Sequence, residues 1–411
     1  MKRGCTFHFL DVGQGSSCVV TYGDGRGFVI DCGPSGLISS QVVQKHVRWL
    51  DCVFVSHNHK DHAGGTVRIL SDYDFRYRDL VPPAYWNPLP EPGQAAMPKR
   101  EVWFLIDQPP TQIELYALFS GQLQPRGSKS NPPFASSKAA ELASRWMPRR
   151  LEGGQAFADK EADIRVTCLS PTMILNQQVQ ARAGVGAALP AGATPASKPK
   201  RSKSQHANAT SGVLVVTYEK NKDVIFGADA TIEAWEGIYR RIPKRIECEV
   251  LVLPHHGGLM ERDKCTRKQL EWFFGEVVLP KTVLISVGTA NTYNHPRREV
   301  VKFLRNLEFK PGHKVGIVCT EITPRCCRSP AKLKPGVTAP TIFSQSGSVV
   351  GPRSVACAAS ITMTLGPGGV TWGSPFANSS RVCGWCGWQA FQDAIVDSSK
   401  EKKWRPLCRT H

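Results

Sequence analysis

A run of ten residues, Ser56-His57-Asn58-His59-Lys60-Asp61-His62-Ala63-Gly64-Gly65, constrains the fold of this chain more than any other stretch. It places three imidazoles and a carboxylate directly after the apolar run Cys52–Val55. That run is rich in β-branched and aromatic residues and predicts a buried strand, so His57 and His59 leave its end on the same side. Side chains that are this costly to bury together favour a metal ion. We interpret His57 and His59 as one pair of ligands and Asp61 and His62 as another; the alternative is a solvated turn rich in histidine.

Other apolar runs end in the same residue types. They lead to Asp31-Cys32-Gly33, to Gly227-Ala228-Asp229-Ala230, to Pro254-His255-His256-Gly257 and to Tyr293-Asn294-His295-Pro296. One such strand end is commonly a turn or a helix cap. Several of them in one chain predict that separate strand ends converge on one site. Imidazole and carboxylate ligands suit zinc first, and manganese or iron less well.

These strings resemble those of the metallo-β-lactamase fold hydrolases, and within them the group typified by the metallo-hydrolase domain of the DNA-uptake protein ComEC. The matching strings are Leu10-Asp11-Val12-Gly13-Gln14-Gly15, Ile30-Asp31-Cys32-Gly33, the histidine run, Gly227-Ala228-Asp229, Pro254-His255-His256-Gly257 and Asn294-His295-Pro296. The resemblance implies an α/β fold, the four-layer αββα sandwich. Because no apolar run has the length of a membrane span, we expect a standalone enzyme without the channel of ComEC.

The resemblance further implies two divalent metal ions, zinc or, as second choice, manganese. Its implied ligands are His57, His59, Asp61, His62, Asp229 as the bridging carboxylate, and His255. It brings His256 and His295 into the site as ligand, proton donor or phosphate contact, so that Asp61, His256 and His295 are the expected catalytic residues. Asp31, Asn208 and Ser211 are expected to support the ligands from behind. Many members of the fold carry a further ligand His where this chain has Asn208–Ser211, and His206 is an alternative ligand.

The charge of the chain suggests its substrate. The formal net charge is +18 and the pI about 9.4, which favours polyanionic partners such as nucleic acid. Basic residues gather at Lys198, Lys200, Arg201 and Lys203, and again at Arg145, Arg149 and Arg150. A phosphodiester substrate would account for both the metals and the charge, whereas a solvated basic surface is the alternative.

We therefore expect hydrolysis of phosphodiester bonds, with DNA as substrate. In the implied reaction, two metal ions activate a shared water as hydroxide for attack on phosphorus. One alternative is a phosphodiesterase for a small ester, such as a cyclic nucleotide or a phosphocholine ester. The other is a non-catalytic nucleic-acid-binding sensor. The resemblance also suggests a partner protein in a bacterial DNA-processing or defence system.

Two domains are expected, a hydrolase domain over 1–318 and a Cys-rich C-terminal module with β-strands over 319–411. The first is expected to contain an insertion at about 76–160, as a lid, substrate platform or structural excursion, and a mobile low-complexity linker at about 178–207. The candidate ligands of a structural zinc in the module are Cys319, Cys326, Cys357, Cys383 and Cys386, although buried unpaired thiols fit as well. No apolar run approaches the about 20 residues of a membrane span, so we expect a cytoplasmic protein without membrane contact.

Periodicity predicts the remaining elements. A hairpin is expected over 5–33 with its turn at Gly23-Asp24-Gly25, and a helix over 40–49. Strands are expected at 162–169, 213–217, 359–364 and 369–372. Apolar residues at helical spacing follow Asp229 and His295, and Pro296 is expected as a first helical residue.

Overall fold

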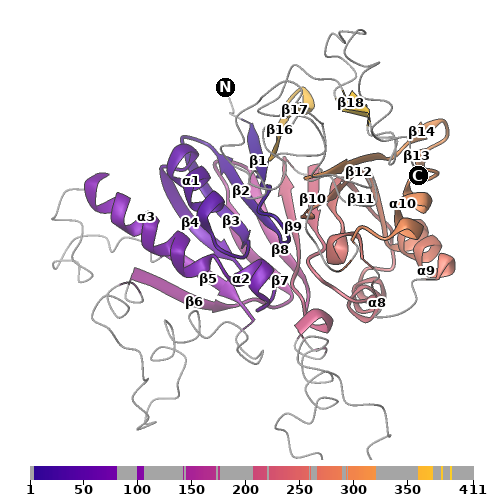
Figure 1. Ribbon diagram of the computed structural model, residues 1–411, viewed down its shortest axis with the longest axis horizontal. Helices are drawn as coiled ribbons and strands as arrows, with labels where there is room; N and C mark the ends of the chain where they lie inside the picture. Colours follow the sequence, from indigo (N-terminus) through magenta and orange to yellow (C-terminus); the bar gives the residue numbers. More distant parts are fainter. Residues whose placement is uncertain are drawn as a thin grey trace, which may run out of the picture.

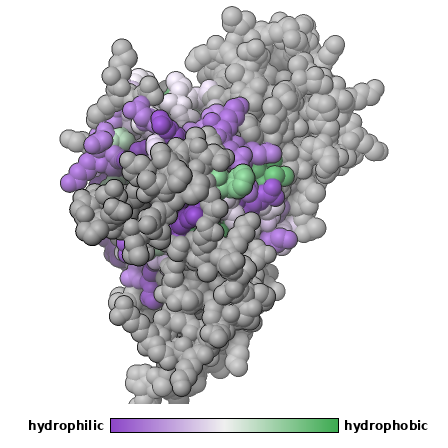
Figure 2. Space-filling model, turned by 90° about the vertical axis from the view of Figure 1, so that its left-hand side faces the viewer, coloured by the Kyte–Doolittle hydropathy of each residue, from purple (hydrophilic) through white to green (hydrophobic). Residues whose placement is uncertain are grey.

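The computed structural model describes residues 4–80, 100–105, 142, 145–172, 175, 207–219, 222–258, 260, 266–288, 293, 295–320, 360–373, 381–382 and 389–390. In these ranges the chain forms two large β-sheets with helices on their outer faces (Figure 1). The side that carries α3 and β6 is mostly hydrophilic where it is described (Figure 2). None of the described helices is long and apolar enough to span a bilayer.

The first sheet has eight strands in the order β17-β16-β1-β2-β3-β4-β5-β6. The strands are β1 (Cys5–Phe9), β2 (Ser17–Tyr22), β3 (Arg26–Cys32), β4 (Trp49–Phe54), β5 (Arg100–Phe104), β6 (Trp146–Arg150), β16 (Ile361–Gly366) and β17 (Gly369–Gly373). The helices α1 (Leu37–His46) and α3 (Thr66–Leu80) pack on its outer face. The short α2 (Lys60–Ala63) follows the end of β4.

The second sheet has seven strands in the order β15-β12-β11-β10-β9-β8-β7. They are β7 (Gly154–Asp159), β8 (Ile164–Ser170), β9 (Val213–Tyr218), β10 (Lys222–Phe226), β11 (Ile246–Val252), β12 (Val278–Ile285) and β15 (Gly316–Cys319). Its helices are α8 (Ile232–Arg241), α9 (Arg267–Trp272) with the adjoining π-turn η3 (Phe273–Val277), and α10 (Arg298–Leu304), besides the 3-10 turn η2 (Pro254–Gly257). The short strands β13 (Glu308–Lys310) with β14 (His313–Lys314), and β18 (Arg381–Val382) with β19 (Gln389–Ala390), form two small ribbons.

Side chains along each strand alternate between the two faces of the sheet, and this alternation separates the layers of the fold. Phe28 and Phe54 of the first sheet lie in one apolar cluster with Val216 and Val250 of the second, and all four are fully buried. Their neighbours along the strands, such as Val53, point to the opposite face and contact the helices. Two sheets pressed together with helices outside give the four-layer αββα sandwich, as the sequence predicted.

The predicted insertion is narrower than expected. Residues 100–104 and 146–159, assigned to it from the sequence, form β5, β6 and β7, which belong to the two sheets. Val102 and Phe104 are fully buried, so these strands are part of the main core. Their short lengths and their Pro and Trp residues obscure the strand pattern in the sequence. The rest of the insertion, except for residues 76–80, 105, 142, 145 and 160, lies outside the described residues, as does the linker up to 206.

The C-terminal strands also belong to the main fold. β16 pairs antiparallel with β1, with Phe7 opposite Met363, so residues 361–373 extend the first sheet although the sequence assigned them to a separate module. The boundary between the two predicted domains stays a prediction.

Two helices begin elsewhere than expected. α1 spans Leu37–His46 and so starts three residues before the predicted 40–49, because Gly36 adopts the left-handed conformation at its start (φ 68°). Pro296 precedes α10, whose first residue is Arg298.

Candidate metal centre

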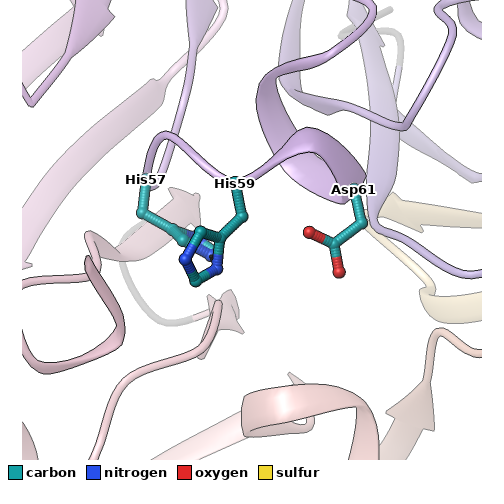
Figure 3. A group of neighbouring side chains, drawn as sticks. All are labelled: His57, His59 and Asp61. Atoms are coloured by element: carbon teal, nitrogen blue, oxygen red, sulfur yellow. Dashed lines mark hydrogen bonds between the residues drawn. The ribbon is translucent and has the colours of Figure 1, made fainter. Parts of the chain in front are cut away.

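The loop after β4 gathers its polar side chains at one end of the sheet sandwich. His57 and His59 leave the strand end, and Asp61 and His62 lie in α2, whose first turn begins after His59. His57 Nε2 lies 3.1 Å from His59 Nδ1. Figure 3 shows both rings and the Asp61 carboxylate directed toward the same space. The side chains of the run therefore gather at one place, while their division into two pairs of ligands stays a prediction.

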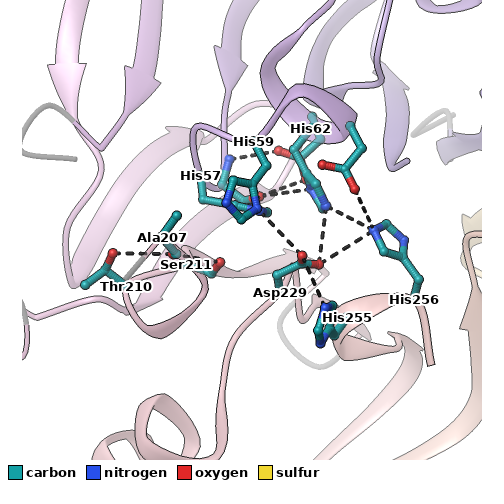
Figure 4. A network of polar contacts seen from close by, with 12 residues as sticks. His57, His59, His62, Ala207, Thr210, Ser211, Asp229, His255 and His256 are labelled. Carbon is teal, nitrogen blue, oxygen red and sulfur yellow. Dashed lines mark hydrogen bonds and ion pairs between the residues drawn. The ribbon is translucent and has the colours of Figure 1, made fainter. Parts of the chain in front are cut away.

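The second sheet completes the cluster from two neighbouring strands. β10 and β11 are parallel and adjacent, so their carboxyl ends meet at the same edge and bring Asp229 beside His256. Asp229 Oδ2 lies 3.6 Å from His57 Nε2, while Oδ1 lies 3.3 Å from His62 Nε2 and 3.6 Å from His256 Nε2 (Figure 4). Each carboxylate oxygen thus faces a different group of donors, which is the geometry that a bridging ligand requires.

The donor spacing fits a metal ion. His62 Nε2 lies 3.3 Å from His256 Nε2, and His256 Nε2 lies 3.4 Å from Asp61 Oδ2. A tetrahedral zinc with bonds near 2.05 Å separates its ligand atoms by about 3.3 Å. Donor atoms within 4.8 Å of one another form three groups: His57 with His59 and Asp61, His57 with His62 and Asp229, and Asp61 with His62 and His256. Imidazole and carboxylate donors at these distances suit a divalent cation.

A hydrogen-bonded support fixes which nitrogen of each ring faces the centre. Asp31 accepts hydrogen bonds from the Ser56 hydroxyl (2.9 Å) and from His62 Nδ1 (2.7 Å). Because the Ser56 proton is directed to Asp31, its oxygen accepts from His57 Nδ1 at 3.1 Å. His256 Nδ1 donates to the Ser286 carbonyl at 2.7 Å. With a metal bound, each of these three rings would keep its proton on Nδ1 and offer the Nε2 lone pair as ligand.

The backbone of the site loops is strained. Asp31, Ala228, His255 and His256 all have φ between 46° and 54°, in the left-handed region that side chains other than glycine adopt at a cost of about 1–3 kcal/mol each. Ala228, His255 and His256 follow strand ends at the cluster, and Asp31 is the last residue but one of β3. Strain of this kind persists where surrounding contacts impose it and is common at functional sites.

Electrostatics prepare the donors for a cation. Burial raises the pKa of Asp229, but the positive charges of His255 and His62 outweigh it and hold that pKa well below its usual range. Burial likewise opposes ionisation of Asp61, yet its hydrogen bond with His256 brings the net pKa down. Burial lowers the pKa of His59 to about 4. Ionised carboxylates and neutral imidazoles are the forms that bind metals.

His255 and His295 lie beside the cluster. His255 Nε2 is 3.9 Å from Asp229 Oδ2 and its side chain is 30% exposed, whereas His256 is 4% exposed. His256 therefore has the position at the donors that the resemblance implied for His255, although the assignment of ligands stays a prediction. The ring of His295 lies 5.1 Å from that of His255. Burial and the charge of His255 lower the pKa of His295 to about 3.

The loop 207–212 lies against the histidine loop, since Gly212 N donates to Ser56 O at 2.7 Å. The Ser211 hydroxyl donates to Ala207 O at 3.4 Å, so its contact is within its own loop. Asn208 Oδ1 is buried and has no hydrogen-bond partner among the described residues. His206 lies outside the described residues, as does Asn294.

Most of the cysteines predicted to bind a structural zinc lie outside the described residues. Cys319 is buried in β15, at the end of the apolar cluster of the second sheet. Cys326, Cys357, Cys383 and Cys386 lie outside the described residues. A zinc site at these cysteines therefore stays a prediction.

The basic group near Trp146 is neutralised. Arg149 Nε lies 2.8 Å from Glu101 Oε1, Arg145 Nη1 lies 3.7 Å from Asp74 Oδ2, and Arg150 Nη1 lies 4.0 Å from Glu152 Oε2. Arg145 and Arg149 have acidic neighbours that only folding brings close, whereas Glu152 is two residues from Arg150 in the sequence. The basic residues 198–203 lie outside the described residues.

Two of the supporting residues, Ser56 and Ser286, were missed in the sequence analysis. They carry no signal of their own, although Ser56 follows a predicted strand directly. The string Asp11-Val12-Gly13-Gln14-Gly15 carries a signal only through its resemblance. In the structure Ser16 N donates to Asp61 O at 3.0 Å, and a Cβ at Gly15 would approach Asp61 O to 2.4 Å. The glycine thus lets this loop lie directly under the loop that carries Asp61.

The chain was compared with known proteins. Similar solved structures include the metallo-beta-lactamase fold protein YhfI from Bacillus subtilis, with 11% identity, 61% of this chain and 71% of that chain covered, and a TM-score of 0.32. The match to Tm1679, a metal-dependent hydrolase of the beta-lactamase superfamily, has 14% identity and a TM-score of 0.36. It covers 78% of this chain and 95% of that chain. The match to the short form of human tRNase Z has 11% identity and a TM-score of 0.31. It covers 60% of this chain and 76% of that chain. No curated protein matches the sequence. Residues 10–127 match the family model of the metallo-beta-lactamase superfamily.

Proposed function

We propose that the chain is a metal-dependent hydrolase that cleaves phosphodiester bonds, with DNA as its substrate. The supporting observation is the position of Asp229, whose two oxygens face two separate groups of donors. Sites with two metal ions are suited to displacement at phosphorus, because the attacking and leaving oxygens are both stabilised. The net charge of +18 adds an attraction for polyanions. We also propose zinc as the metal, membership of the ComEC-like branch, and a role beside other bacterial DNA-processing or defence proteins.

The chain's own residues would hold and orient the reactants. His57 and His59 would hold one ion, and Asp61, His62 and His256 the other, with Asp229 toward both. Bound divalent ions supply a nucleophile at neutral pH and positive charge for the phosphoryl oxygens. The low pKa of His295 keeps its imidazole neutral at pH 7. Such a ring can donate its N–H to a phosphoryl oxygen or to the leaving group.

A small phosphodiester is the second candidate substrate. The observation in its favour is that Arg145, Arg149 and Arg150 are paired with acidic residues. Paired cations attract a distant polyanion less strongly than their number suggests, so part of the charge argument for DNA is weakened.

Metal-loaded protein should be assayed on bis-para-nitrophenyl phosphate and on single-stranded, duplex and RNA oligonucleotides. We expect hydrolysis by the wild type and none by the double variant Asp61→Ala/Asp229→Ala, which should still bind nucleic acid. Activity on the small ester with none on oligonucleotides would favour the second candidate. Equal DNA cleavage by the double variant would disprove the assignment, and a metal-loaded protein inert on every phosphodiester would leave a nucleic-acid sensor.

A further inference from the structure

An exposed aromatic ring lies beside the candidate metal centre. Tyr293 is 61% exposed, and its ring stacks on that of His295 with a centroid distance of 5.9 Å and an interplanar angle of 14°. His295 itself is 5% exposed. One face of the Tyr293 ring is therefore held against the site, and much of the side chain is in contact with solvent. Exposed aromatic rings are the surfaces on which single-stranded nucleic acids stack their bases.

The helix that follows carries a basic stripe. Arg298, Lys302 and Arg305, which we call the α10 stripe, are exposed at i, i+4 and i+7 and so lie along one face. The opposite face of the helix, with Val300, Val301 and Leu304, is buried in the core. This packing fixes the stripe toward solvent.

The α10 stripe lacks the acidic neighbours that other basic residues have. Within the described part of the chain, none of its three side chains forms an ion pair with a carboxylate, in contrast to Arg145, Arg149 and Arg150. Its charge is therefore available to a ligand. By helix rise, Arg298 and Arg305 are about 10 Å apart along the axis, so the three cations form one continuous basic strip.

The start of α10 is held against the metal centre. Arg297 N donates to Gly257 O at 2.8 Å, and a Cβ at Gly258 would approach His295 Cε1 to 2.3 Å. The segment that carries Tyr293, His295 and the α10 stripe therefore lies against the loop that carries His256. Arg297 also has a buried Nε without a hydrogen-bond partner among the described residues.

We infer that a single strand of nucleic acid runs from the metal centre across Tyr293 and along α10, with an unpaired base on the tyrosine ring and phosphates on the α10 stripe. For the reaction that follows binding, this inference rests on the proposed function. A duplex fits less well, because its bases are already stacked and paired and cannot cover the ring.

The first experiment measures affinity for a fluorescein-labelled oligodeoxythymidine with phosphorothioate linkages, over a range of salt concentrations, by anisotropy of the metal-loaded protein. The variant is Arg298→Gln/Lys302→Gln/Arg305→Gln. We expect at least about tenfold weaker binding at low salt, and a slope of log affinity against log salt that is shallower by about 2, since each lost phosphate contact on a single strand removes about 0.7.

A matched control carries the same charge change at the opposite edge. Arg240 and Lys244 are exposed at the end of α8 and before β11, and Lys160 is exposed before β8. These positions are at the amino ends of β11 and β8, away from the cluster. Lys160→Gln/Arg240→Gln/Lys244→Gln should keep most of the affinity and slope. If both triple variants lose the same slope, the charge acts non-specifically and the inference is wrong.

The second experiment compares Tyr293→Ala with Tyr293→Phe on the same oligonucleotide. Loss of one stacked base should weaken binding by about 5- to 100-fold in Tyr293→Ala, whereas Tyr293→Phe keeps the ring and should bind like the wild type. A blunt duplex of the same length should bind the wild type more weakly than the single strand. Equal binding by both variants, or a preference for the duplex, would overturn the inference.

The binding assays and the hydrolysis assays can fail independently. Wild-type protein that binds the single strand through Tyr293 and the α10 stripe but hydrolyses nothing would contradict the proposed function alone. Wild-type protein that hydrolyses bis-para-nitrophenyl phosphate, with binding insensitive to Tyr293 and the stripe, would contradict the inference alone.

Discussion

The two halves of the sandwich contribute to the metal centre in different ways. The first half supplies His57, His59, Asp61 and His62 from one short loop. The second half supplies Asp229 and His256 from the ends of two different strands, which meet because β10 and β11 are neighbours in the sheet. One half of the site is thus encoded locally, and the other depends on strand order.

The hydrogen-bond partners that orient the ligand histidines also differ between the two halves. In the first half, His57 and His62 are held by side chains, through Ser56 and Asp31. In the second half, His256 is held by the main-chain carbonyl of Ser286. A side-chain support can be removed by one substitution, whereas a carbonyl support persists whatever residue provides it. Substitutions can therefore test how independent the two halves are.

Asp229→Asn should have the largest effect, because Asp229 faces both donor groups. We expect phosphodiester hydrolysis to fall by about a thousandfold or more, together with loss of bound metal measured by elemental analysis. Asp61→Asn is the matched change in the first half. The side chain of Asp61 is 27% exposed and that of Asp229 only 4%, so Asp61→Asn should retain more metal. If Asp61→Asn empties the site and Asp229→Asn does not, the bridging assignment is incorrect.

The adjacent residues His255 and His256 provide the next test, which asks which of the two binds the metal. His256→Ala should weaken metal binding by about 100-fold, as expected for loss of a donor, while His255→Ala should change it by less than about tenfold. Competition with a fluorescent chelator measures both. The opposite order would restore His255 as the ligand that the resemblance implied.

A smaller difference is expected between the two serines. Ser56→Ala removes the link between His57 and Asp31 and should weaken metal affinity about tenfold, the lower range for supports of this kind. Ser286→Ala keeps the carbonyl that holds His256, and should leave the affinity close to that of the wild type. The same chelator competition applies, and equal losses in both variants would show that the supports do not differ as described.

Comparison with His8, a buried imidazole outside the site, shows how Asp31 and Asp229 change the pKa of His62. Burial alone would lower the pKa of His62, but Asp31 and Asp229 outweigh it and raise that pKa. His8 is also buried, stacks on His46, and has only basic neighbours, Lys45 and His46, acting on its charge. Burial first, and then these charges, lower the pKa of His8 to about 4.

The smallest predicted effect concerns His8, which should make the stability of the fold depend on pH. Its folded pKa lies below the unfolded value near 6.5, so the unfolded state binds the proton more readily and stability falls as pH drops from about 6.5 toward 4. Between pH 7 and pH 5 the wild type should lose about 1–2 kcal/mol more than His8→Gln. Urea unfolding at both pH values measures this difference, and identical losses would contradict it.

Much of the fold could be anticipated from residue patterns. The hairpin with its turn at Gly23-Asp24-Gly25, the strand before His57 and the helix after Asp229 all have strong periodicity, and each is present. The edge strands β5 and β6 were assigned to an insertion because a short strand with Pro or Trp has little periodicity. β16 was assigned to a separate module because pairing with β1 links residues over 350 positions apart.

The sequence by itself determined the donor types and the local order of His57, His59, Asp61 and His62, since neighbouring residues on one loop cannot separate far. Only the tertiary structure decided how Asp229 and His256 lie against them, that His256 lies closer than His255 to Asp229, and that Arg145 and Arg149 have acidic partners. The physical reason is that strand order and strained loop conformations set the direction of side chains, and both depend on packing between distant segments.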